Sequence, residues 1–510
     1  MSSAHSSCTG GRSRSHWLAS GVTLLACGLA GFPALAQESP APAPDPSVAA
    51  PVPETPAPSA EAVAVARAAE LDARLRAVTD KQEALATELA KRGKDATVTT
   101  IDDRGVLVRS ADGAYVLKLR ALLQIDGRFF LKDNVMQDKD TFLIRKMRPY
   151  IEGTLFNLVD YRLTPDFAGG SVQVMEAYVD AHPWAWLRLR VGKMKGPVGL
   201  ERLQSDADIP FVERALDQNL TTSRELGLQL WGDIACGLAS YTLGVYNGGA
   251  DASNGDVDSN HAKDFQGRLF LQPFKIKGLQ NLGSLGIGIA GSTGQRKGLP
   301  QIGTTAAVPG LPSFKTAGQN TFFGYNAPTS DPTGVLTTFA HLRQTRINPQ
   351  LYYFYAGFGV LGEYVLSRQH VQKGNDQATL DQQAAHATAS VSIGGKQGFD
   401  GVTPTAPLGS GAGSWGALEL AVRWSWLKVD AKSFADAAVP GSVAYADPLK
   451  SARKAQSWAG AINYIPRRSF RLALDFERTR FQGGAAAADK LTVADRKTEN
   501  VIIGRTQVNF

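Results

Sequence analysis

The sequence predicts an all-β protein, a transmembrane antiparallel β-barrel of about 16 strands preceded by a short N-terminal coiled-coil helix. Polar and apolar residues alternate over runs of about ten residues, long and short connections alternate along the chain, and the chain ends in the amphipathic run VIIGRTQVNF. The alternation of polar and apolar residues alone would also fit a soluble β-sandwich with one solvent-exposed face. The other two favour a barrel that crosses a membrane.

The strand pattern is clearest in residues 115–131. Leu117, Leu119 and Leu123 share one face, whereas Lys118 and Arg120 lie on the other. Runs of about ten residues suit a tilted strand that crosses a bilayer, since soluble strands usually have about five or six. We expect the charged faces to line a water-filled lumen. The predicted strands are 115–131, 141–156, 159–167, 172–182, 187–195, 223–232, 238–247, 264–272, 284–293, 345–356, 358–370, 383–394, 415–429, 456–465, 469–481 and 500–510.

The connections differ in length according to their position in the chain. Those that follow odd-numbered strands are long and include 196–222, 248–263, 294–344, 430–455 and 482–499. Those that follow even-numbered strands are tight and include 157–158, 183–186, 233–237, 357 and 466–468. Long external loops and short periplasmic turns are typical of outer-membrane barrels. The long connection 395–414 breaks this pattern, so strand boundaries within 294–344 and 395–455 stay open.

The N-terminus resembles a secretory signal. Arg12 and Arg14 precede an apolar run that ends in Ala34-Leu35-Ala36, so residues 1–36 are expected to be removed. A lipoprotein signal at Cys27 is the alternative. A secreted precursor with a barrel pattern indicates the bacterial outer membrane, with outer-membrane lipid and lipopolysaccharide as its surroundings.

Three segments lie between the signal and the barrel. Residues 37–60 are a Pro/Ala-rich periplasmic linker, because this composition cannot bury a core. Residues 61–92 are a coiled-coil segment, and 93–114 are a connector to the barrel at 115–510. The residues that would face the partner helices follow one another at alternating spacings of four and three positions, and all but Gln82 are apolar. This seam consists of Leu71, Leu75, Val78, Gln82, Leu85 and Leu89. A single amphipathic helix is the alternative for this segment.

The barrel face predicts where ions would pass. Rings of lysine and arginine select anions because they replace part of the lost hydration. The long connection 196–222 also holds Glu201, Asp206, Asp208, Glu213 and Asp217, which leave the net selectivity open. For each base, a salt bridge within the wall is the alternative to contact with the permeating ion. The candidates for the anion path lie on the lumen face of the strands by their alternation, or in or next to the long connection 196–222. They are Arg120, Arg128, Lys146, Arg148, Arg188, Arg190, Lys193, Lys195, Arg202 and Arg214.

Enzymatic and nucleic-acid-binding functions gain little support. A barrel hydrolase needs a histidine with a Ser, Asn or Asp partner, and neither His182 nor His341 lies in a recognisable nucleophile motif. No group of residues has the spacing of metal ligands, so neither a metal nor another cofactor is expected. The formal charge of +7 is too modest to indicate nucleic acid as a partner.

Several segments resemble the family of phosphate-selective porins O and P. They include RKMRPYIEGTLF (145–156), DYRLTPDFAGGSVQVMEAYVDAHPW (160–184), LRLRVGKMKGPVGLERLQS (187–205), FVERAL (211–216), SRELGLQLWG (223–232), LGVYNGG (243–249) and the terminal VIIGRTQVNF. The likeness covers about residues 115–510 and is most specific in its first third. Lys146 and Met147 depart from the family, which favours arginine and a small residue at these places.

The resemblance implies a homotrimer of sixteen-stranded barrels, each with its third external loop folded inside the pore. It adds Arg145 to the expected anion path and gives Lys193 and Lys195 special weight. A terminal Phe510 on an amphipathic strand resembles the signal that barrel-insertion machinery reads. We therefore expect a passive channel for small anions, with phosphate or polyphosphate among them. A general non-selective porin and a barrel-anchored periplasmic tether are the alternatives.

Overall fold

The computed structural model describes residues 59–103, 105–131, 139–254, 261–275, 281–300, 306–328, 331, 333–435 and 441–510. The expected signal peptide and nearly all of the expected linker lie outside these residues. The chain divides into two compact units, Met1–Gly93 and Lys94–Phe510.

The described part of the first unit is helical. Helix α1 (Ala60–Asp95) covers the expected coiled-coil segment and continues past Gly93, where we expected it to end. An isolated glycine costs a helix only about 1 kcal/mol, so Gly93 does not stop it. Leu71, Leu75, Val78 and Leu85 on the expected seam are between 55% and 67% exposed. In the ranges that the structure describes, no helix combines the length and the hydropathy that a membrane span requires.

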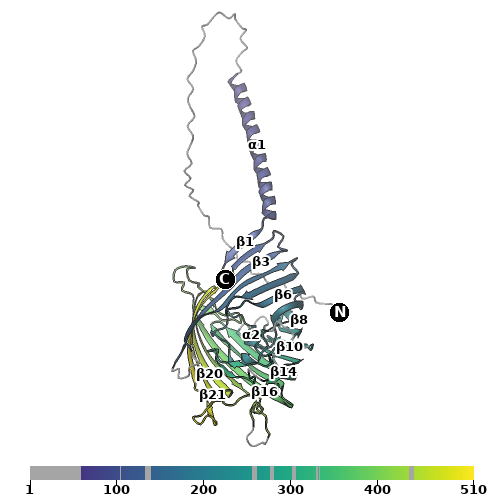
Figure 1. The fold of residues 1–510 in the computed structure, drawn as a ribbon. Coiled ribbons are helices and arrows are strands. Elements are labelled where there is room, and N and C mark those ends of the chain that lie inside the picture. Colours follow the sequence, from purple (N-terminus) through teal and green to yellow (C-terminus); the bar gives the residue numbers. More distant parts are fainter. Residues whose placement is uncertain are drawn as a thin grey trace, which may run out of the picture. The chain divides into compact units, whose positions relative to one another are not determined.

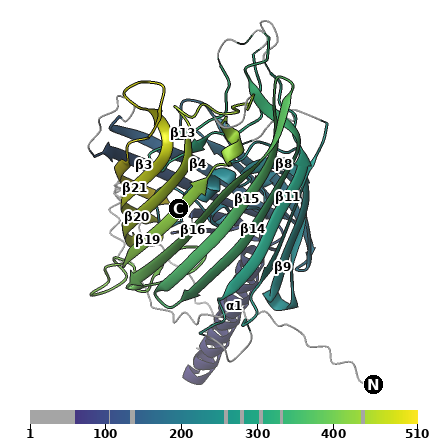
Figure 2. The ribbon, with the colours of Figure 1, turned by 90° about the horizontal axis from the view of Figure 1, so that it is seen from below.

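The second unit is a closed antiparallel β-barrel (Figures 1 and 2). Each strand pairs with the next, and the circle closes where Val501–Asn509 of the last strand pair with Phe130–Leu122 of the first. The predicted count of sixteen barrel strands is confirmed. The barrel strands are β3 (Val116–Phe130), β4 (Thr141–Leu155), β5 (Val159–Asp166), β6 (Gln173–Trp184), β7 (Leu187–Lys195), β8 (Arg224–Ile234), β9 (Ala239–Tyr246), β10 (Asp264–Leu271), β11 (Gly286–Gln295), β14 (Thr338–Tyr355), β15 (Phe358–Lys373), β16 (Asp376–Ile393), β19 (Ala417–Lys428), β20 (Ala452–Arg467), β21 (Phe470–Ala486) and β23 (Glu499–Asn509).

Most connections have the expected lengths. The connection between the predicted strands 358–370 and 383–394 is shorter than expected, because β15 continues to Lys373 and β16 begins at Asp376. The segment 394–416 between β16 and β19 is long, as the sequence indicates, but it adds no barrel strand. It carries only the short pair β17 (Gly395–Lys396) and β18 (Thr403–Pro404). The other small elements are α2 (Leu200–Leu203), the 3-10 helices η1 (Leu216–Leu220), η2 (Ala235–Gly237) and η3 (Ala431–Ser433), and strands β12 (Phe314–Lys315), β13 (Thr321–Phe323) and β22 (Val493–Asp495).

The expected connector contains a hairpin that the sequence pattern does not predict. Strands β1 (Val98–Asp102) and β2 (Gly105–Arg109) pair with each other, and β2 pairs with the first residues of β3. Val106 lies opposite Leu119, on the part of β3 that β23 does not reach. The hairpin therefore extends the barrel wall at the short-turn end.

The two faces of the wall have opposite character. Large apolar side chains such as Phe129, Val422 and Trp458 are exposed on the outside, where lipid would cover them. Charged side chains such as Arg346 and Arg423 are buried on the inside. Charges can be this deeply buried only because folded segments of the chain fill part of the lumen.

An apolar cluster inside the barrel fills the long-loop end on one side. Phe314 and Phe323 from the connection between β11 and β14 pack with Leu220 of η1, Phe434 and the wall residue Phe481. The rings of Phe314 and Phe323 are stacked with centroids 5.1 Å apart. Because this cluster packs against β15, β16, β19, β20 and β21, open space is left mainly beside β3–β10.

Candidate functional site

The connection between β7 and β8, residues 196–223, folds into the lumen; we call it the lumen segment. Glu363 on β15 fixes one end of it. This carboxylate accepts hydrogen bonds from the backbone N–H groups of Leu200 (2.6 Å) and Glu201 (2.9 Å) at the start of α2. It also accepts from the side chains of Gln218 (2.7 Å) and Asn348 (2.9 Å). Four donors saturate the carboxylate and hold the segment against β15.

The opposite wall holds the middle of the lumen segment. Asp475 on β21 accepts a hydrogen bond from Val212 N–H at 2.5 Å. Arg471 donates to the backbone oxygen of Ile209, and Arg505 on β23 donates to that of Val212. The lumen segment therefore bridges the barrel between β15 and β21–β23 and divides the lumen.

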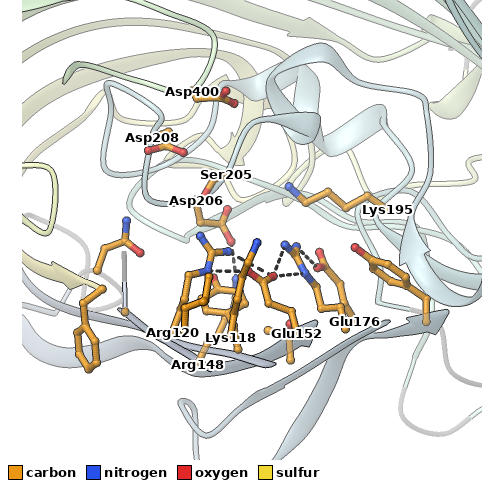
Figure 3. Close-up of a pocket in the computed structure, with 18 of the residues that line it drawn as sticks. Lys118, Arg120, Arg148, Glu152, Glu176, Lys195, Ser205, Asp206, Asp208 and Asp400 are labelled. Carbon is orange, nitrogen blue, oxygen red and sulfur yellow. Dashed lines mark hydrogen bonds and ion pairs between the residues drawn. The ribbon is translucent and has the colours of Figure 1, made fainter. Parts of the chain in front are cut away.

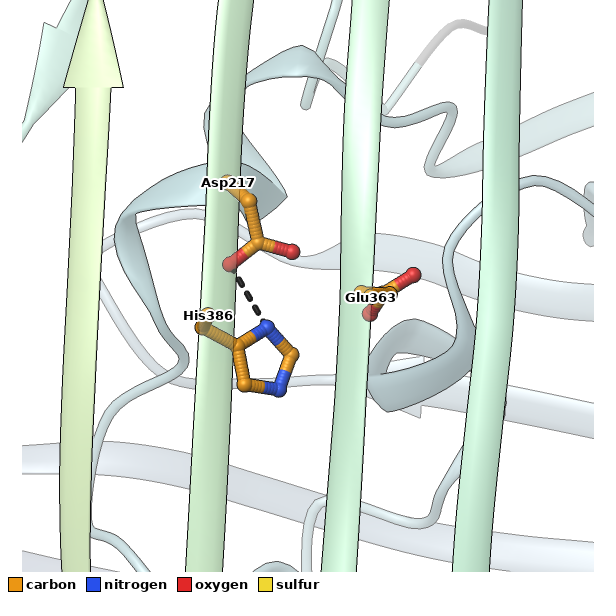
Figure 4. A group of neighbouring side chains, drawn as sticks. All are labelled: Asp217, Glu363 and His386. Atoms are coloured by element: carbon orange, nitrogen blue, oxygen red, sulfur yellow. Dashed lines mark hydrogen bonds and ion pairs between the residues drawn. The ribbon is translucent and has the colours of Figure 1, made fainter.

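The only three side chains in the described ranges whose geometry suits a metal ion belong to this attachment. Ligand atoms of Asp217, Glu363 and His386 lie within 4.8 Å of one another (Figure 4). His386 Nδ1 lies 2.8 Å from Asp217 Oδ1. Because Glu363 already accepts four hydrogen bonds, its lone pairs are not available to an ion. The geometry fits a fastening for η1 better than a metal centre.

Below the lumen segment, on the short-turn side, lies a cavity of about 1000 Å³ (Figure 3). The segment contributes Ser205, Asp206 and Asp208, and the wall contributes residues from β3 to β10. Seven carboxylate residues line it, together with ten bases, which are Arg109, Lys118, Arg120, Arg148, Arg162, Arg190, Lys195, Arg224, Arg268 and Arg468. The lining therefore has a surplus of positive charge.

A β-bulge in β4 explains why consecutive bases reach the lumen. Gln124 on β3 lies opposite Lys146, but the next residue, Ile125, lies opposite Ile144, so Arg145 has no partner in the ladder. A bulge reverses the inside–outside alternation. Arg145 and Lys146 therefore both face inward, although neighbours in a regular strand face opposite ways.

Most of the predicted bases form ion pairs with carboxylates. Arg120 pairs with Glu152 at 2.9 Å, Arg190 with Asp180 at 2.7 Å, and Arg145 with Glu213 at 2.6 Å. Arg128, Lys146, Arg148, Arg188 and Arg214 are also paired with carboxylates. Lys193 is buried and does not line the cavity. Five of the eleven predicted bases have a carboxylate of the wall as partner, which is the alternative that sequence reasoning kept. Arg145, Lys146 and Arg214 instead pair with carboxylates of the lumen segment.

Two predicted bases lack such a partner among the described residues. Lys195 donates to the backbone oxygens of Leu203 and Gln204. Arg202 donates to the backbone oxygen of Gln218, and its burial lowers the pKa of the guanidinium to about 10. Neither has a carboxylate oxygen within 4.0 Å in the described part of the chain.

The lumen segment carries two carboxylates that several bases surround. Glu213 faces Arg128 and Arg145, with Arg505 at 3.9 Å. Burial opposes its ionisation, but Arg145 and Arg128 hold the pKa of Glu213 well below its usual range. Asp206 faces a second group of bases at the cavity. The lumen segment thus neutralises part of the wall charge.

Sequence reasoning missed five cavity bases and one histidine. The missed bases in the cavity lining are Arg109, Arg162, Arg224, Arg268 and Arg468. Arg268 donates to Gln350 Oε1 at 2.8 Å and has no carboxylate within 4.0 Å among the described residues. The alternation of residues along β5 and β10 places Arg162 and Arg268 on the lumen face, so both could have been found from the sequence. His386 could not be found in this way, because only the folded lumen segment brings Asp217 to it.

Comparison with known proteins fits this architecture. The sequence profile of the phosphate-selective porin O and P family matches residues 117–510. The chain belongs to this family. It is a porin of the bacterial outer membrane, and the family consists of channels rather than enzymes. A search of curated proteins found no similar sequence.

Solved structures that resemble this porin are also outer-membrane proteins. OmpT of Vibrio cholerae is 9% identical, with 78% of this chain and 98% of that chain covered and a TM-score of 0.47. The channel DcaP of Acinetobacter baumannii is 9% identical, with 79% and 99% covered and a TM-score of 0.47. An anion-selective porin from Comamonas acidovorans is 9% identical, with 78% and 100% covered and a TM-score of 0.47.

Proposed function

We propose that this porin is a passive diffusion channel that favours small anions, phosphate among them. The observation that carries the proposal is the cavity beneath the lumen segment, where ten bases face seven carboxylates. Lys195 and Arg268 in this lining have no carboxylate within 4.0 Å among the described residues. The charge of Arg268 would compensate an anion that loses water in this narrow space.

The basic residues of the barrel wall also favour anions over cations. Lys118 and Arg120 lie at the short-turn end of β3, and Arg190 and Arg268 lie at the same end of β7 and β10. Fixed charge of one sign in a low-dielectric cleft raises the local concentration of the opposite ion. The paired bases contribute less, because their carboxylates cancel most of the field.

The test is the single-channel reversal potential in planar bilayers under a KCl gradient. Chloride should be more permeant than potassium, and addition of phosphate should lower the chloride current by competition. A reversal potential near zero would point to a general porin, and the opposite sign to a cation-tolerant one. Either result would contradict the anion proposal.

We also infer that the porin is a homotrimer whose helices associate outside the barrels. After removal of residues 1–36, the linker 37–60 would precede the helical bundle, and the connector 93–114 would join the bundle to each barrel. The exposed seam of Leu71, Leu75, Val78 and Leu85 supports the inference, because an isolated helix would gain from burying it. Outer-membrane lipid, lipopolysaccharide and, through Phe510, the barrel-insertion machinery are the further partners that we propose.

The same helix favours the tether as a second function. A 36-residue helix is about 54 Å long, so it could reach well into the periplasm. Deletion of residues 37–92 separates the two functions. A pore keeps its conductance after this deletion, whereas a tether loses its attachment to the cell wall, which can be measured by co-sedimentation with purified peptidoglycan.

A further inference from the structure

The outer face of the barrel changes character at the long-loop end of β19, β20 and β21, which are neighbours in the wall (Figure 2). Their outward side chains are apolar or aromatic from the short-turn end up to Trp424 and Trp458, whose ring centroids lie 6.4 Å apart. Level with this pair and beyond it, four bases share the outer face. We call them the outer bases, and they are Lys428 on β19, Lys454 on β20, and Arg478 and Arg480 on β21.

The burial pattern of the strands places the outer bases on the membrane side of the wall. Arg478 and Arg480 are exposed, whereas Thr479 between them is buried. Lys428 is likewise exposed, and Lys454 is half-buried on the outer face of β20. None of the four belongs to the lining of the cavity below the lumen segment. They are therefore separate from the proposed anion path.

The outer bases form one group. Lys428 and Lys454 lie directly opposite each other in the ladder between β19 and β20. Arg480 lies opposite Gln456 and is thus a diagonal neighbour of Lys454. Opposite Cβ atoms of an antiparallel pair are about 4.5–5.5 Å apart and diagonal ones about 7–8 Å, and like charges directly opposite each other destabilise a sheet. An anion bound between these bases would remove that repulsion.

The described part of the barrel wall does not compensate this charge. None of the outer bases has a carboxylate oxygen within 4.0 Å among the described residues. Asp381 is the one carboxylate of the described barrel strands that faces outward at the long-loop end, and it already binds Arg368 at 2.7 Å. The wall of a second copy would present the same surface, so it could not supply the missing charge. Charge complementarity therefore favours an anionic partner from the membrane.

The outer bases lie at the depth of lipid headgroups. The long loops of an outer-membrane barrel are external, so this end of the strands meets the outer leaflet. Tryptophan is enriched where headgroups meet acyl chains, which places Trp424 and Trp458 at that boundary. Below this pair, Gly460 lies between Val422 and Phe476 in the ladder, and a Cβ at Gly460 would meet no heavy atom within 4 Å. The face thus has a shallow apolar furrow beneath a group of bases.

We propose that the outer bases bind the phosphate groups of lipopolysaccharide, with an acyl chain along the furrow at Gly460. The lipid A part of this molecule carries phosphates directly above its acyl chains, which is the order of charge and apolar surface on this face. Arginine donates forked N–H groups to phosphate oxygens, and lysine adds a point charge. The proposal rests on the proposed contact with lipopolysaccharide and names the site of that contact. It does not depend on which ions pass through the pore.

The test is native mass spectrometry of the whole porin in detergent, with diphosphoryl lipid A as the probe. The fraction of chains with bound lipid A at increasing lipid concentration gives the dissociation constant. This constant should rise at least about tenfold in Arg478→Gln/Arg480→Gln, because two charged contacts with phosphate are lost. Arg478→Lys/Arg480→Lys keeps both charges and should bind lipid A more tightly than the glutamine variant. Equal binding by the wild type and the glutamine variant would overturn the proposal.

Arg343→Gln/Arg368→Gln is the matched control, since it removes two exposed arginines from the long-loop ends of β14 and β15. The dissociation constant of this control should change less than about twofold, because Arg368 is already paired and both side chains are exposed. Heat-dependent mobility on gels shows whether each variant has a folded barrel. The same loss of affinity in both double variants would mean that lipid A responds only to total charge, which would also overturn the proposal.

The wild-type porin provides a comparison that does not depend on how the variants fold. Lipid A without its phosphates, and separately phosphatidylglycerol, should bind more weakly than diphosphoryl lipid A. Equal binding of the dephosphorylated form would show that the acyl chains alone are recognised, and equal binding of phosphatidylglycerol would indicate a general site for anionic lipids. Displacement of lipid A by an equal concentration of inorganic phosphate would assign the site to the free ion. Each of these three results would contradict the proposal.

Reversal potentials separate this proposal from the anion channel. Arg478→Gln/Arg480→Gln should have the reversal potential of the wild type, because both arginines face away from the lumen. A changed reversal potential with unchanged binding of lipid A would place them in the ion path and refute the lipid site. A cation-selective wild type that binds lipid A as expected would refute the proposed anion channel alone.

Discussion

Arg268 shows how a single side chain can contribute more to ion selection than a pair of opposite charges. It lines the cavity, donates to Gln350 and lies over the ring of Phe270 at 4.3 Å. Its charge is not cancelled by a carboxylate within 4.0 Å among the described residues. Arg120, also in the lining, shares its charge with Glu152. Uncompensated charge at the cavity should therefore dominate selectivity.

We predict that Arg268→Gln lowers the chloride-to-potassium permeability ratio roughly two- to fivefold. The reason is the loss of a base that faces the cavity without an opposing carboxylate. Reversal potentials under a KCl gradient measure the ratio. Arg368→Gln is the control, because Arg368 is exposed and bound to Asp381, so its loss is screened by solvent. An equal effect of the two changes would contradict the prediction.

The carboxyl group of Asp208 should make the ion selectivity of the channel depend on pH. Burial raises the pKa of Asp208 to about 6, with Arg468 opposing the shift and Asp400 adding to it. Above pH 6 the carboxylate is charged and reduces the positive surplus of the cavity. Below pH 6 it is protonated and the surplus grows.

Anion preference should accordingly rise as the pH falls from 7 to 5, with a midpoint near 6. Reversal potentials recorded across this range follow the change. Asp208→Asn should show the acidic value at every pH in the range. If the reversal potential of Asp208→Asn still changed with a midpoint near pH 6, the titrating group would be another residue.

At the scale of structural elements, the lumen segment depends on a few buried contacts with the wall. Glu363 accepts four hydrogen bonds that fasten α2 and η1 to β14 and β15. Hydrogen bonds to a charged group contribute about 1.5–3 kcal/mol each, so the loss of this carboxylate should weaken the attachment by several kcal/mol. The barrel wall itself would keep its ladder.

We predict that Glu363→Ala leaves a folded barrel whose lumen segment opens. Trypsin should then cleave after Arg202 or Arg214, and mass spectrometry identifies the cut. Single-channel current should become larger and noisier, because the segment no longer narrows the pore. Asp381→Asn, which removes a half-buried wall carboxylate far from the lumen segment in sequence, should remain resistant to trypsin. Resistance of Glu363→Ala would mean that Asp475, Arg471 and Arg505 suffice.

At the scale of the whole molecule, helix α1 should decide how firmly the chains of the proposed trimer associate. Leu75 lies on the apolar seam, whereas Arg76 lies beside it and pairs with Asp72 at the surface. We predict that Leu75→Glu lowers the temperature at which trimers separate on semi-native gels, because a charge would be buried in the bundle. Arg76→Glu should change it little.

The conductance of each pore should be the same in both variants, because neither residue belongs to the barrel. If Leu75→Glu trimers separated at the wild-type temperature, the seam would not be an interface between chains. The helix would then be the single amphipathic helix that the sequence left open.

The sequence by itself determined the barrel. Inside–outside alternation is a local property of an extended backbone, so each of the sixteen strands could be located from its own residues. The lengths of the connections, including the long segment 394–416, could be read in the same way. The hairpin β1–β2 was missed because its short strands alternate too briefly to stand out.

Only the tertiary structure decided which bases are free and which are paired. Arg505 binds Asp126 across 379 positions of sequence, and Glu363 binds Leu200 N–H across 163. Such partners are set by barrel closure and by the inward fold of the lumen segment. Parity places a charge on the lumen face, but it carries no information about the partner that the folded chain brings to that charge. The uncompensated charge of Arg268, and the place of Asp206 among the bases of β4 and β8, follow from those contacts.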